Sequence, residues 1–302
     1  MMKGLLFYLT YPFLFFVASM PFPLLYKISD FLYYIIRLTG YRQDVVLKNL
    51  KNSFPQKSPD EIEAISKRYY RYLCDLTLET FKTMRMTEKE SNKRCVFHNT
   101  DWLDKLYEEK KSFIIVMGHY GNWEWAGPSF TLNTKFQLVV IYRPLSNPYF
   151  EKMLSRMRTR FGTRITPVNN TLRDMVSNRK EITATAFIAD QTARRDTAYW
   201  MHFLNQDTAV FTGPEKLAIK FDYPVVYMNV RRTRRGYYDV TPELLFADPK
   251  GASEGEISET FMRRLEQDII NDPTPWLWSH KRWKHTRMLH NDNDTAKQRT
   301  TS

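Results

Sequence analysis

The stretch that decides the fold is FIIVMGHYGNWEWAG, residues 113–127. Its first five residues, 113–117, form an apolar run typical of a buried strand, and a turn with two glycines follows. His119 lies where the strand ends, and Glu124 comes five residues later. Because glycine permits a tight turn, the sequence predicts a strand, a turn and a helix that bring the carboxylate against the imidazole.

The rest of the chain repeats this alternation of strands and helices. Further apolar runs rich in Ile, Val and Phe lie at 138–142, 183–189 and 224–230. Helical patterns separate them, around 148–160, 171–180, 214–221 and 255–271. Earlier, SPDE at 58–61 is a capping box that starts an amphipathic helix over roughly 59–85. We therefore expect an α/β fold, with a largely parallel central sheet flanked by helices.

The N-terminus is strongly apolar. Residues 4–26 carry no charged side chain, and three prolines interrupt the run. This indicates a hydrophobic membrane anchor, either one short kinked span or a deeply embedded interfacial segment. An aromatic, amphipathic stretch follows, with Lys27, Arg37 and Arg42 expected to face lipid headgroups. A cleaved signal peptide is the alternative.

Composition limits the remaining organisation. The 302 residues include 45 basic and 33 acidic side chains, a net charge of +12, which favours an anionic partner. We expect an anchor and interfacial helix over 1–40, one catalytic domain over 41–289, and a polar, disordered tail over 290–302. The two cysteines form no disulfide or metal spacing, and there is no P-loop or dinucleotide fingerprint, so we expect no metal and no cofactor.

His119 and Glu124 are the candidate catalytic pair. Ligands of open α/β sheets bind at the carboxyl ends of the strands, where the first strand places His119. A carboxylate that holds one ring nitrogen leaves the other free as a general base. His202 and Asp207 have the same spacing but no strand end or glycine turn before them, so we interpret them as a surface pair.

A serine or cysteine nucleophile is less consistent with the sequence. GASEG at 251–255 fits the G-x-S-x-G pattern, yet the polar turn ADPK precedes it where a nucleophile elbow needs a buried strand. Ser253 is therefore interpreted as a loop residue before a helix. Neither Cys74 nor Cys95 has a cationic or histidine-rich setting that would activate a thiol.

Several motifs, taken together and in order, resemble one family. VMGHYGNWEWAG resembles the H-x4-E/D block of glycerolipid-type acyltransferases. The chain as a whole, over roughly 5–287, resembles the lipid A late acyltransferases, which include the lauroyl and myristoyl transferases. The blocks that carry this resemblance are NLKNSFPQKSPDEIEAI, YRPLSNPYFEKMLSRMRTRFG, FIADQTARR, FTGPEKLAIK and WLWSHKRWKHTR.

The resemblance implies transfer of a fatty acyl chain from a carrier thioester to a hydroxyl of an anionic glycolipid. His119 would take the proton of the hydroxyl, and Glu124 would orient His119. The implied donor is acyl carrier protein, and the implied acceptor is a lipid A precursor. The implied location is the cytoplasmic face of the inner membrane, with no nucleic acid as partner.

Further polar residues are candidates for substrate binding. Guanidinium groups suit phosphate, although ion pairs on a solvated helix are the alternative, and the resemblance ranks Arg158 first. Asp190 and Gln191 end the run 183–189 and so should face the same rim as His119. The candidate substrate-binding residues are Asn122, Arg143, Arg158, Arg160, Asp190, Gln191 and Arg231.

Two other functions stay open at this point. An acyltransferase with the same mechanism could act on another glycolipid or on an aminolipid. A non-enzymatic membrane or nucleic-acid binder would explain the positive charge, but it leaves the ordered set of motifs unexplained.

Overall fold

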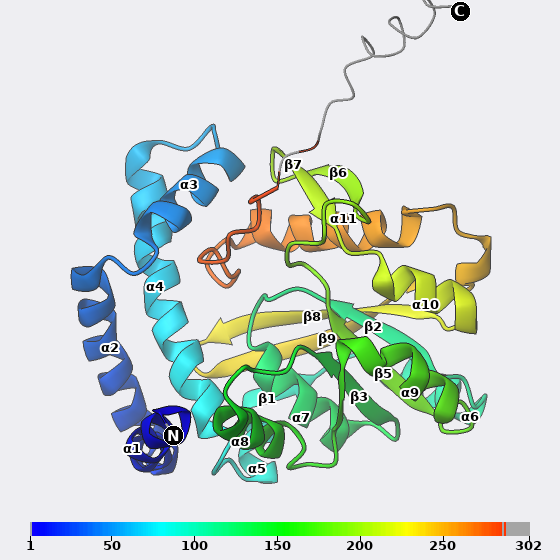
Figure 1. Ribbon diagram of the computed structural model, residues 1–302, viewed down its shortest axis with the longest axis horizontal. Coiled ribbons are helices and arrows are strands. Elements are labelled where there is room, and N and C mark those ends of the chain that lie inside the picture. Colours follow the sequence, from blue (N-terminus) through cyan, green and yellow to red (C-terminus); the bar gives the residue numbers. More distant parts are fainter. Residues whose placement is uncertain (1, 286, 288–302) are drawn as a thin grey trace, which may run out of the picture.

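A seven-stranded sheet with helices on both faces forms the centre of the molecule (Figure 1). The computed structural model describes residues 2–285 and 287. The strand order is β1-β9-β8-β2-β5-β3-β4, and every neighbouring pair is parallel except β8 and β9. The strands are β1 (Cys95–Phe97), β2 (Phe113–Met117), β3 (Gln137–Tyr142), β4 (Arg164–Pro167), β5 (Thr183–Ile188), β8 (Val225–Arg234) and β9 (Tyr237–Phe246). The predicted α/β fold with a largely parallel sheet is confirmed.

Strand β2 lies inside the sheet, between β5 and β8, and all five of its residues are buried. Alternate side chains of a strand point to opposite faces. Ile114 and Val116 accordingly pack in one hydrophobic cluster, and Phe113, Ile115 and Met117 pack in the other. The continuous apolar run 113–117 thus covers two cores at once, as a central parallel strand requires.

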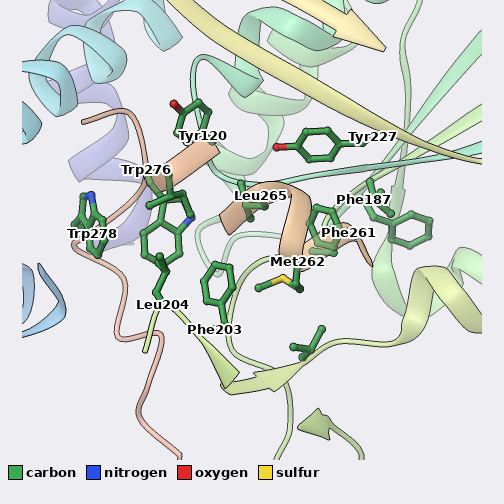
Figure 2. Packing of buried hydrophobic residues seen from close by; sticks show 14 of the residues in the cluster. Tyr120, Phe187, Phe203, Leu204, Tyr227, Phe261, Met262, Leu265, Trp276 and Trp278 are labelled. Atoms are coloured by element: carbon green, nitrogen blue, oxygen red, sulfur yellow. The ribbon is translucent and has the colours of Figure 1, made fainter. Parts of the chain in front are cut away.

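Helices from different parts of the chain close the two faces. The first cluster joins the sheet to α11 (Glu256–Asn271) and to the C-terminal tryptophans, as Figure 2 shows for Phe261, Met262, Leu265 and Trp276. The second joins it to α7 (Trp123–Asn133). The remaining helices of this part are α5 (Glu88–Arg94), α6 (Asp101–Glu108), α8 (Pro148–Arg158), α9 (Thr171–Ser177) and α10 (Gly213–Phe221), with short 3-10 turns η1 (Val168–Asn170) and η2 (Pro249–Gly251).

Four helices precede the sheet and lie along one side of it, in blue and cyan in Figure 1. They are α1 (Met2–Ser19), α2 (Phe22–Thr39), α3 (Gln43–Ser53) and α4 (Pro59–Lys82). The capping box at the start of α4 is present: the Ser58 side chain accepts from the backbone N–H of Glu61, whose carboxylate accepts from the N–H of Ser58. Helix α4 packs against α1, α2 and α3, and its Glu79 accepts a hydrogen bond from Tyr238 of β9, which connects these helices to the sheet.

The N-terminal helices expose an unusually apolar surface. None of the helices in the described part of the chain has the length and apolar character needed to cross a bilayer, so the predicted anchor stays a prediction. Arg37 and Arg42, for which contact with headgroups stays a prediction, donate to Glu63 and to the carbonyl of Ser279 within the protein. The exposed large apolar residues of α1 and α2, here called the N-terminal apolar face, are Leu5, Leu6, Tyr8, Leu9, Phe13, Phe15, Phe16, Leu24, Phe31, Tyr34, Ile35 and Leu38.

Several parts of the chain differ from the sequence-based expectation, which did not include the short strands β1 and β4 or the helices α5 and α6. The run 224–230 is not a short strand: β8 continues through the basic residues to Arg234 and turns back as β9, because a glycine at position 236 permits the positive-φ turn. A separate hairpin, β6 (Tyr199–Phe203) and β7 (Gln206–Val210), was not predicted. The expected disordered tail, 290–302, lies outside the described residues.

Candidate active site

His119 and Asp190 meet at the carboxyl edge of the sheet. Strands β2 and β5 run side by side in parallel, so the residues that follow them lie next to each other. The Nδ1 atom of His119 lies 2.6 Å from Oδ1 of Asp190, and the backbone N–H of His119 donates to Oδ2 at 2.9 Å. The indole of Trp276 also donates to Oδ2, at 2.8 Å. The carboxylate is therefore fixed by contacts from three directions.

These contacts keep Asp190 ionised. Burial alone would raise the pKa of this carboxyl, since its side chain is almost fully enclosed, but the charge and hydrogen bonds of His119 and the hydrogen bond from Trp276 lower it below its usual value. An ionised Asp190 accepts a hydrogen bond from Nδ1–H of the imidazole. Nε2 of a neutral His119 is then the acceptor nitrogen.

Gln191 lies against that second nitrogen. Its amide Nε2 is 3.2 Å from Nε2 of His119 and donates a hydrogen bond to it. The imidazole is only partly exposed, and the Trp123 ring packs edge-on against it at a centroid distance of 4.9 Å. The predicted placement of Asp190 and Gln191 at the rim with His119 therefore agrees with the structure.

Glu124 does not hold the imidazole, and the prediction that it does is wrong for this geometry. Its carboxylate is instead bound by Arg158, at the end of α8, through two hydrogen bonds of 3.1 Å and 2.6 Å. The pair is partly buried, which lowers the pKa of Arg158, but the hydrogen bond and charge of Glu124 outweigh this and raise it overall. A bidentate pair of this kind fixes both side chains, so Arg158 is held at the first turn of α7.

Asn122 has a structural role. It is fully buried, its Oδ1 caps α7 by accepting from the backbone N–H of Trp125 at 3.0 Å, and its Nδ2 donates to Oε2 of Glu79 at 2.8 Å. Both polar atoms of the side chain are thus used within the protein. The prediction that Asn122 binds substrate is not supported by these contacts.

Glu79, on α4, was missed by the sequence analysis. It is fully buried and accepts from Asn122 and from the hydroxyls of Tyr26 and Tyr238, at 2.8 Å and 2.7 Å. Burial raises the pKa of this carboxyl, although the hydrogen bond from Tyr238 opposes the shift. Together these contacts connect α2, α4, β9 and the start of α7. An acid at the helical spacing of the apolar face, seven residues after Tyr72 and three after Leu76, is the signal that could have indicated it.

The two glycines of the turn are required by close packing. A Cβ on Gly118 would lie 2.7 Å from the Leu265 side chain. Gly121 has a φ of +63°, and a Cβ there would lie 2.1 Å from the carbonyl oxygen of Val230. The turn that presents His119 is therefore pressed between α11 and β8.

The other predicted arginines lie apart from the His119–Asp190 pair or on the surface. Arg143 follows β3 and is exposed. Arg160 is exposed and donates to the carbonyl of Thr83 at 2.9 Å. Arg231 does not end a strand: it lies within β8, and its exposed side chain pairs with Asp239 at 3.1 Å. Arg158 differs from these three arginines: its side chain is only partly exposed and pairs with Glu124 of the stretch 113–127.

The alternative nucleophiles have unreactive surroundings. The exposed hydroxyl of Ser253 donates a hydrogen bond to the carboxylate of Glu256, the first residue of α11. Burial raises the pKa of Cys74 and of Cys95 to about 12, which keeps both as thiols at neutral pH. His202 is exposed and lies opposite Asp207 in the β6–β7 hairpin, as a surface pair should.

The C-terminal segment adds further groups to the site. Residues 276–283 cross the rim and are fastened by side chains, among them Asn49, which donates to the carbonyls of Trp278 and His280. Trp276, in this segment, donates to Asp190. Arg282 is almost completely buried. Within the described residues, no cluster of His, Cys, Asp and Glu could hold a metal ion.

The fold and site define a class: an α/β protein with an imidazole held by a carboxylate at the carboxyl edge of a mostly parallel sheet. Residues 1–285 match the family described as bacterial lipid A biosynthesis acyltransferase, and the chain belongs to that family.

Curated relatives are distant but extend over most of the chain. It is 24% identical over 249 residues to the lipid A biosynthesis palmitoleoyltransferase of Escherichia coli (strain K12), covering 80% of this chain and 79% of that protein. The lipid A biosynthesis acyltransferase of Shigella flexneri gives the same values. That of Haemophilus influenzae (strain ATCC 51907 / DSM 11121 / KW20 / Rd) is 20% identical, over 76% of this chain and 72% of its own.

Proposed function

We propose that this protein transfers a fatty acyl chain from a thioester donor, acyl carrier protein, to a hydroxyl group of a lipid A precursor. The observation that carries the proposal is the His119–Asp190 pair, because it leaves one imidazole nitrogen available as a base at the edge of the sheet where ligands bind. Membership of the lipid A acyltransferase family supports the acyl group and the acceptor.

The reaction is a direct transfer in which His119 moves the proton. The acceptor hydroxyl replaces the Gln191 amide at Nε2 of His119 and gives its proton to that nitrogen as its oxygen attacks the thioester carbonyl. The carbon–sulfur bond then breaks, and the leaving thiolate takes the proton from the imidazolium. Asp190 holds the proton on Nδ1 and stabilises the imidazolium, as the buried acid does in a serine-hydrolase triad.

Glu124 and Arg158 have a different part in this mechanism from the one first predicted. Glu124 fixes the guanidinium of Arg158 by accepting hydrogen bonds from its Nε and Nη2 atoms. The guanidinium has further N–H groups that are not directed at Glu124. A fixed guanidinium suits either the phosphate of a carrier's phosphopantetheine or the negative oxygen of the tetrahedral intermediate. We therefore keep Glu124 as a functional residue, acting through Arg158 on the substrate.

The membrane-associated part of the proposal is supported by the N-terminal apolar face. Monomeric soluble proteins rarely expose large contiguous apolar patches. Phe7 of α1 stacks on Tyr149 of α8, with ring centroids 5.7 Å apart, so this apolar helix adjoins the helix that carries Arg158. We propose that α1 and α2 lie in the cytoplasmic leaflet of the inner membrane, where a lipid acceptor and a cytosolic thioester donor meet.

The test of the function is product analysis. Purified full-length protein is mixed with acyl carrier protein thioester or with acyl-coenzyme A, and with lipid A precursor, and the lipids are analysed by mass spectrometry. We expect one added acyl chain on the precursor with the carrier-protein donor. Acylation of an aminolipid or another glycolipid, but not of the precursor, would favour the alternative acceptor. No acyl transfer from either donor would contradict the proposal.

A further inference from the structure

Arg282 carries a buried positive charge whose guanidinium no other described residue hydrogen-bonds. Its side chain is 2% exposed, and its Nε, Nη1 and Nη2 atoms have no hydrogen-bond partner among the residues that the structure describes. The other two buried cationic side chains in that part of the chain differ from it. Lys82 donates to two backbone carbonyls, and Arg94 pairs with Glu90.

Such a group is costly to bury. A guanidinium has five N–H donors, and a buried charge is normally paired and hydrogen-bonded. Burial lowers the pKa of Arg282 to about 10, with Asp190 opposing the shift, so the side chain remains protonated at neutral pH. Arg282 therefore stays charged and unsatisfied, and an anion would remove both costs.

Arg282 lies near the His119–Asp190 pair. The negative charge of Asp190 acts on Arg282, and Thr192, two residues after Asp190, donates its hydroxyl to the Arg282 carbonyl at 2.9 Å. Asp190 itself is not the missing partner. Its two oxygens already accept three hydrogen bonds, two from His119 and one from Trp276.

His280 supplies a second unpartnered group beside the first. Its Nδ1 atom is buried and has no hydrogen-bond partner among the described residues. A tight turn, in which the N–H of Arg282 donates to the carbonyl of His280 at 2.8 Å, keeps the two residues together. Burial lowers the pKa of His280 to about 4, so the ring is neutral at neutral pH. Its Nδ1 atom is then able to carry the ring proton and donate a hydrogen bond.

We propose that Arg282, together with Nδ1 of His280, forms a subsite for one phosphate group beside the His119–Asp190 pair. The planar guanidinium matches phosphate through two parallel hydrogen bonds. The phosphate belongs to one of the two substrates, either the phosphopantetheine of the donor or the phosphorylated sugar of the acceptor. That last assignment rests on the function proposed above. Because Arg282 is enclosed, the phosphate reaches it by displacing neighbouring side chains.

The test measures anion-dependent thermal stability of the purified full-length protein. Inorganic phosphate is compared with sodium chloride at equal ionic strength. For the wild type we expect Tm to rise by about 5 °C at phosphate concentrations 100-fold above Kd. Arg282→Met, which replaces the charge by an apolar chain of similar size, should lose this shift and be at least as stable as wild type in chloride. Arg282→Lys should keep a smaller shift.

Arg194→Met is the matched control, since Arg194 is a highly exposed arginine of the same rim region, and it should keep the full phosphate shift. A wild-type shift no larger in phosphate than in chloride would overturn the proposal. So would an equal phosphate shift in Arg282→Met. Failure of Arg282→Met to fold would also overturn it, because that result means that the guanidinium has a structural partner.

Two further ligands identify the source of the phosphate. A larger Tm shift with 4′-phosphopantetheine than with pantetheine, lost in Arg282→Met, assigns the subsite to the donor. A larger shift with glucosamine 1-phosphate than with glucosamine assigns it to the acceptor. If neither phosphorylated compound exceeds its phosphate-free counterpart, the subsite does not bind a substrate phosphate. None of these measurements needs acyl transfer, so this proposal can fail while the proposed enzymatic function stands.

Discussion

Nδ1 of His119 and Oδ1 of Asp190 lie 2.6 Å apart although 71 residues separate them in the chain. Adjacent parallel strands bring them together, since Met117 at the end of β2 is paired with Ile188 at the end of β5. The acid that orients the imidazole is thus supplied by the sheet, while the acid nearest in sequence, Glu124, is bound by Arg158. Asp190 and Glu124 should therefore respond differently to substitution.

Asp190→Asn should leave the protein folded but lower kcat by ~10²–10⁴, because an amide does not hold the Nδ1 proton or stabilise the imidazolium. Acyl transfer rates and circular dichroism measure the two effects. Asp196→Asn is the control, since Asp196 forms an exposed pair with Arg194 and should keep wild-type turnover. Turnover of Asp190→Asn within threefold of wild type would remove Asp190 from the mechanism.

Glu124→Gln and Arg158→Met should each reduce kcat/KM. The kcat/KM of the double variant should be only slightly below that of the less active single variant, because both changes disrupt the same bidentate pair. A double-mutant cycle on kcat/KM measures this coupling. The pair formed by Arg164 and Glu181 on the surface serves as the control cycle and should show little coupling. Strictly additive losses at Glu124 and Arg158 would mean that the two residues act separately.

The reaction should proceed without a covalent acyl-enzyme intermediate. Intact-protein mass spectrometry after mixing with the thioester donor alone should detect no stoichiometric acyl adduct. Cys74→Ala, Cys95→Ala and Ser253→Ala should all remain active, because both thiols are buried and protonated and the serine hydroxyl is hydrogen-bonded to the Glu256 carboxylate at the start of α11. His119→Ala should lose turnover by ~10²–10⁴ with little change in donor affinity. An adduct that disappears when acceptor is added would show a covalent mechanism instead.

His280 should make the protein less stable in mild acid. Burial lowers its folded pKa from the ordinary value of 6.5 to about 4, so the unfolded chain binds more protons between these values and stability falls as pH falls. The charged groups around it are Asp190, which raises its pKa, and Arg282, His119 and Lys284, which lower it.

The free energy of unfolding in chloride buffer should therefore decrease between pH 7 and pH 4 through this group, by about 1–2 kcal/mol once solvent screening of the partly exposed ring is allowed for. His280→Gln should reduce that decrease, whereas His202→Gln, at an exposed position, should not. Urea unfolding at several pH values decides the point, and equal pH dependence in wild type and His280→Gln would contradict it.

Membrane binding should depend on the N-terminal apolar face. Replacing Leu9, Phe13 and Phe16 by serine removes three side chains that are each more than 60% exposed, so the fold should persist while binding to anionic vesicles weakens. Vesicle flotation at low and high salt measures this. Binding that survives the substitutions but disappears in high salt would show electrostatic adsorption without insertion of the apolar face.

The fold was largely predictable from sequence because its signals are local. The apolar runs 113–117 and 183–189 are strong strand patterns, and their carboxyl ends correctly predicted that His119, Asp190 and Gln191 share one rim. The extension of β8 through three arginines was not predictable in this way, because charged side chains carry no apolar periodicity, and the β6–β7 hairpin was also missed.

The site was less predictable because its contacts are between distant residues. Five residues of separation suggested that Glu124 reaches His119, but the preference of Glu124 for a guanidinium from α8, 34 residues later, is decided by tertiary packing. The burial of Glu79 and of Arg282 likewise follows from how separate helices and segments assemble.

The contacts of α2 have a practical consequence for anyone who shortens this chain to obtain a more tractable protein. Residues of α2 do more than present apolar side chains: Tyr26 donates to Glu79, and Ser29 donates to Asp75 at 2.6 Å. Removing the first forty residues would deprive both acids of a hydrogen-bond donor while leaving them inside the protein, and the loss would extend to Asn122 and the start of α7. A shortened protein that keeps α2, or that replaces Glu79 by glutamine, preserves the interior far better than one cut at the end of the apolar sequence.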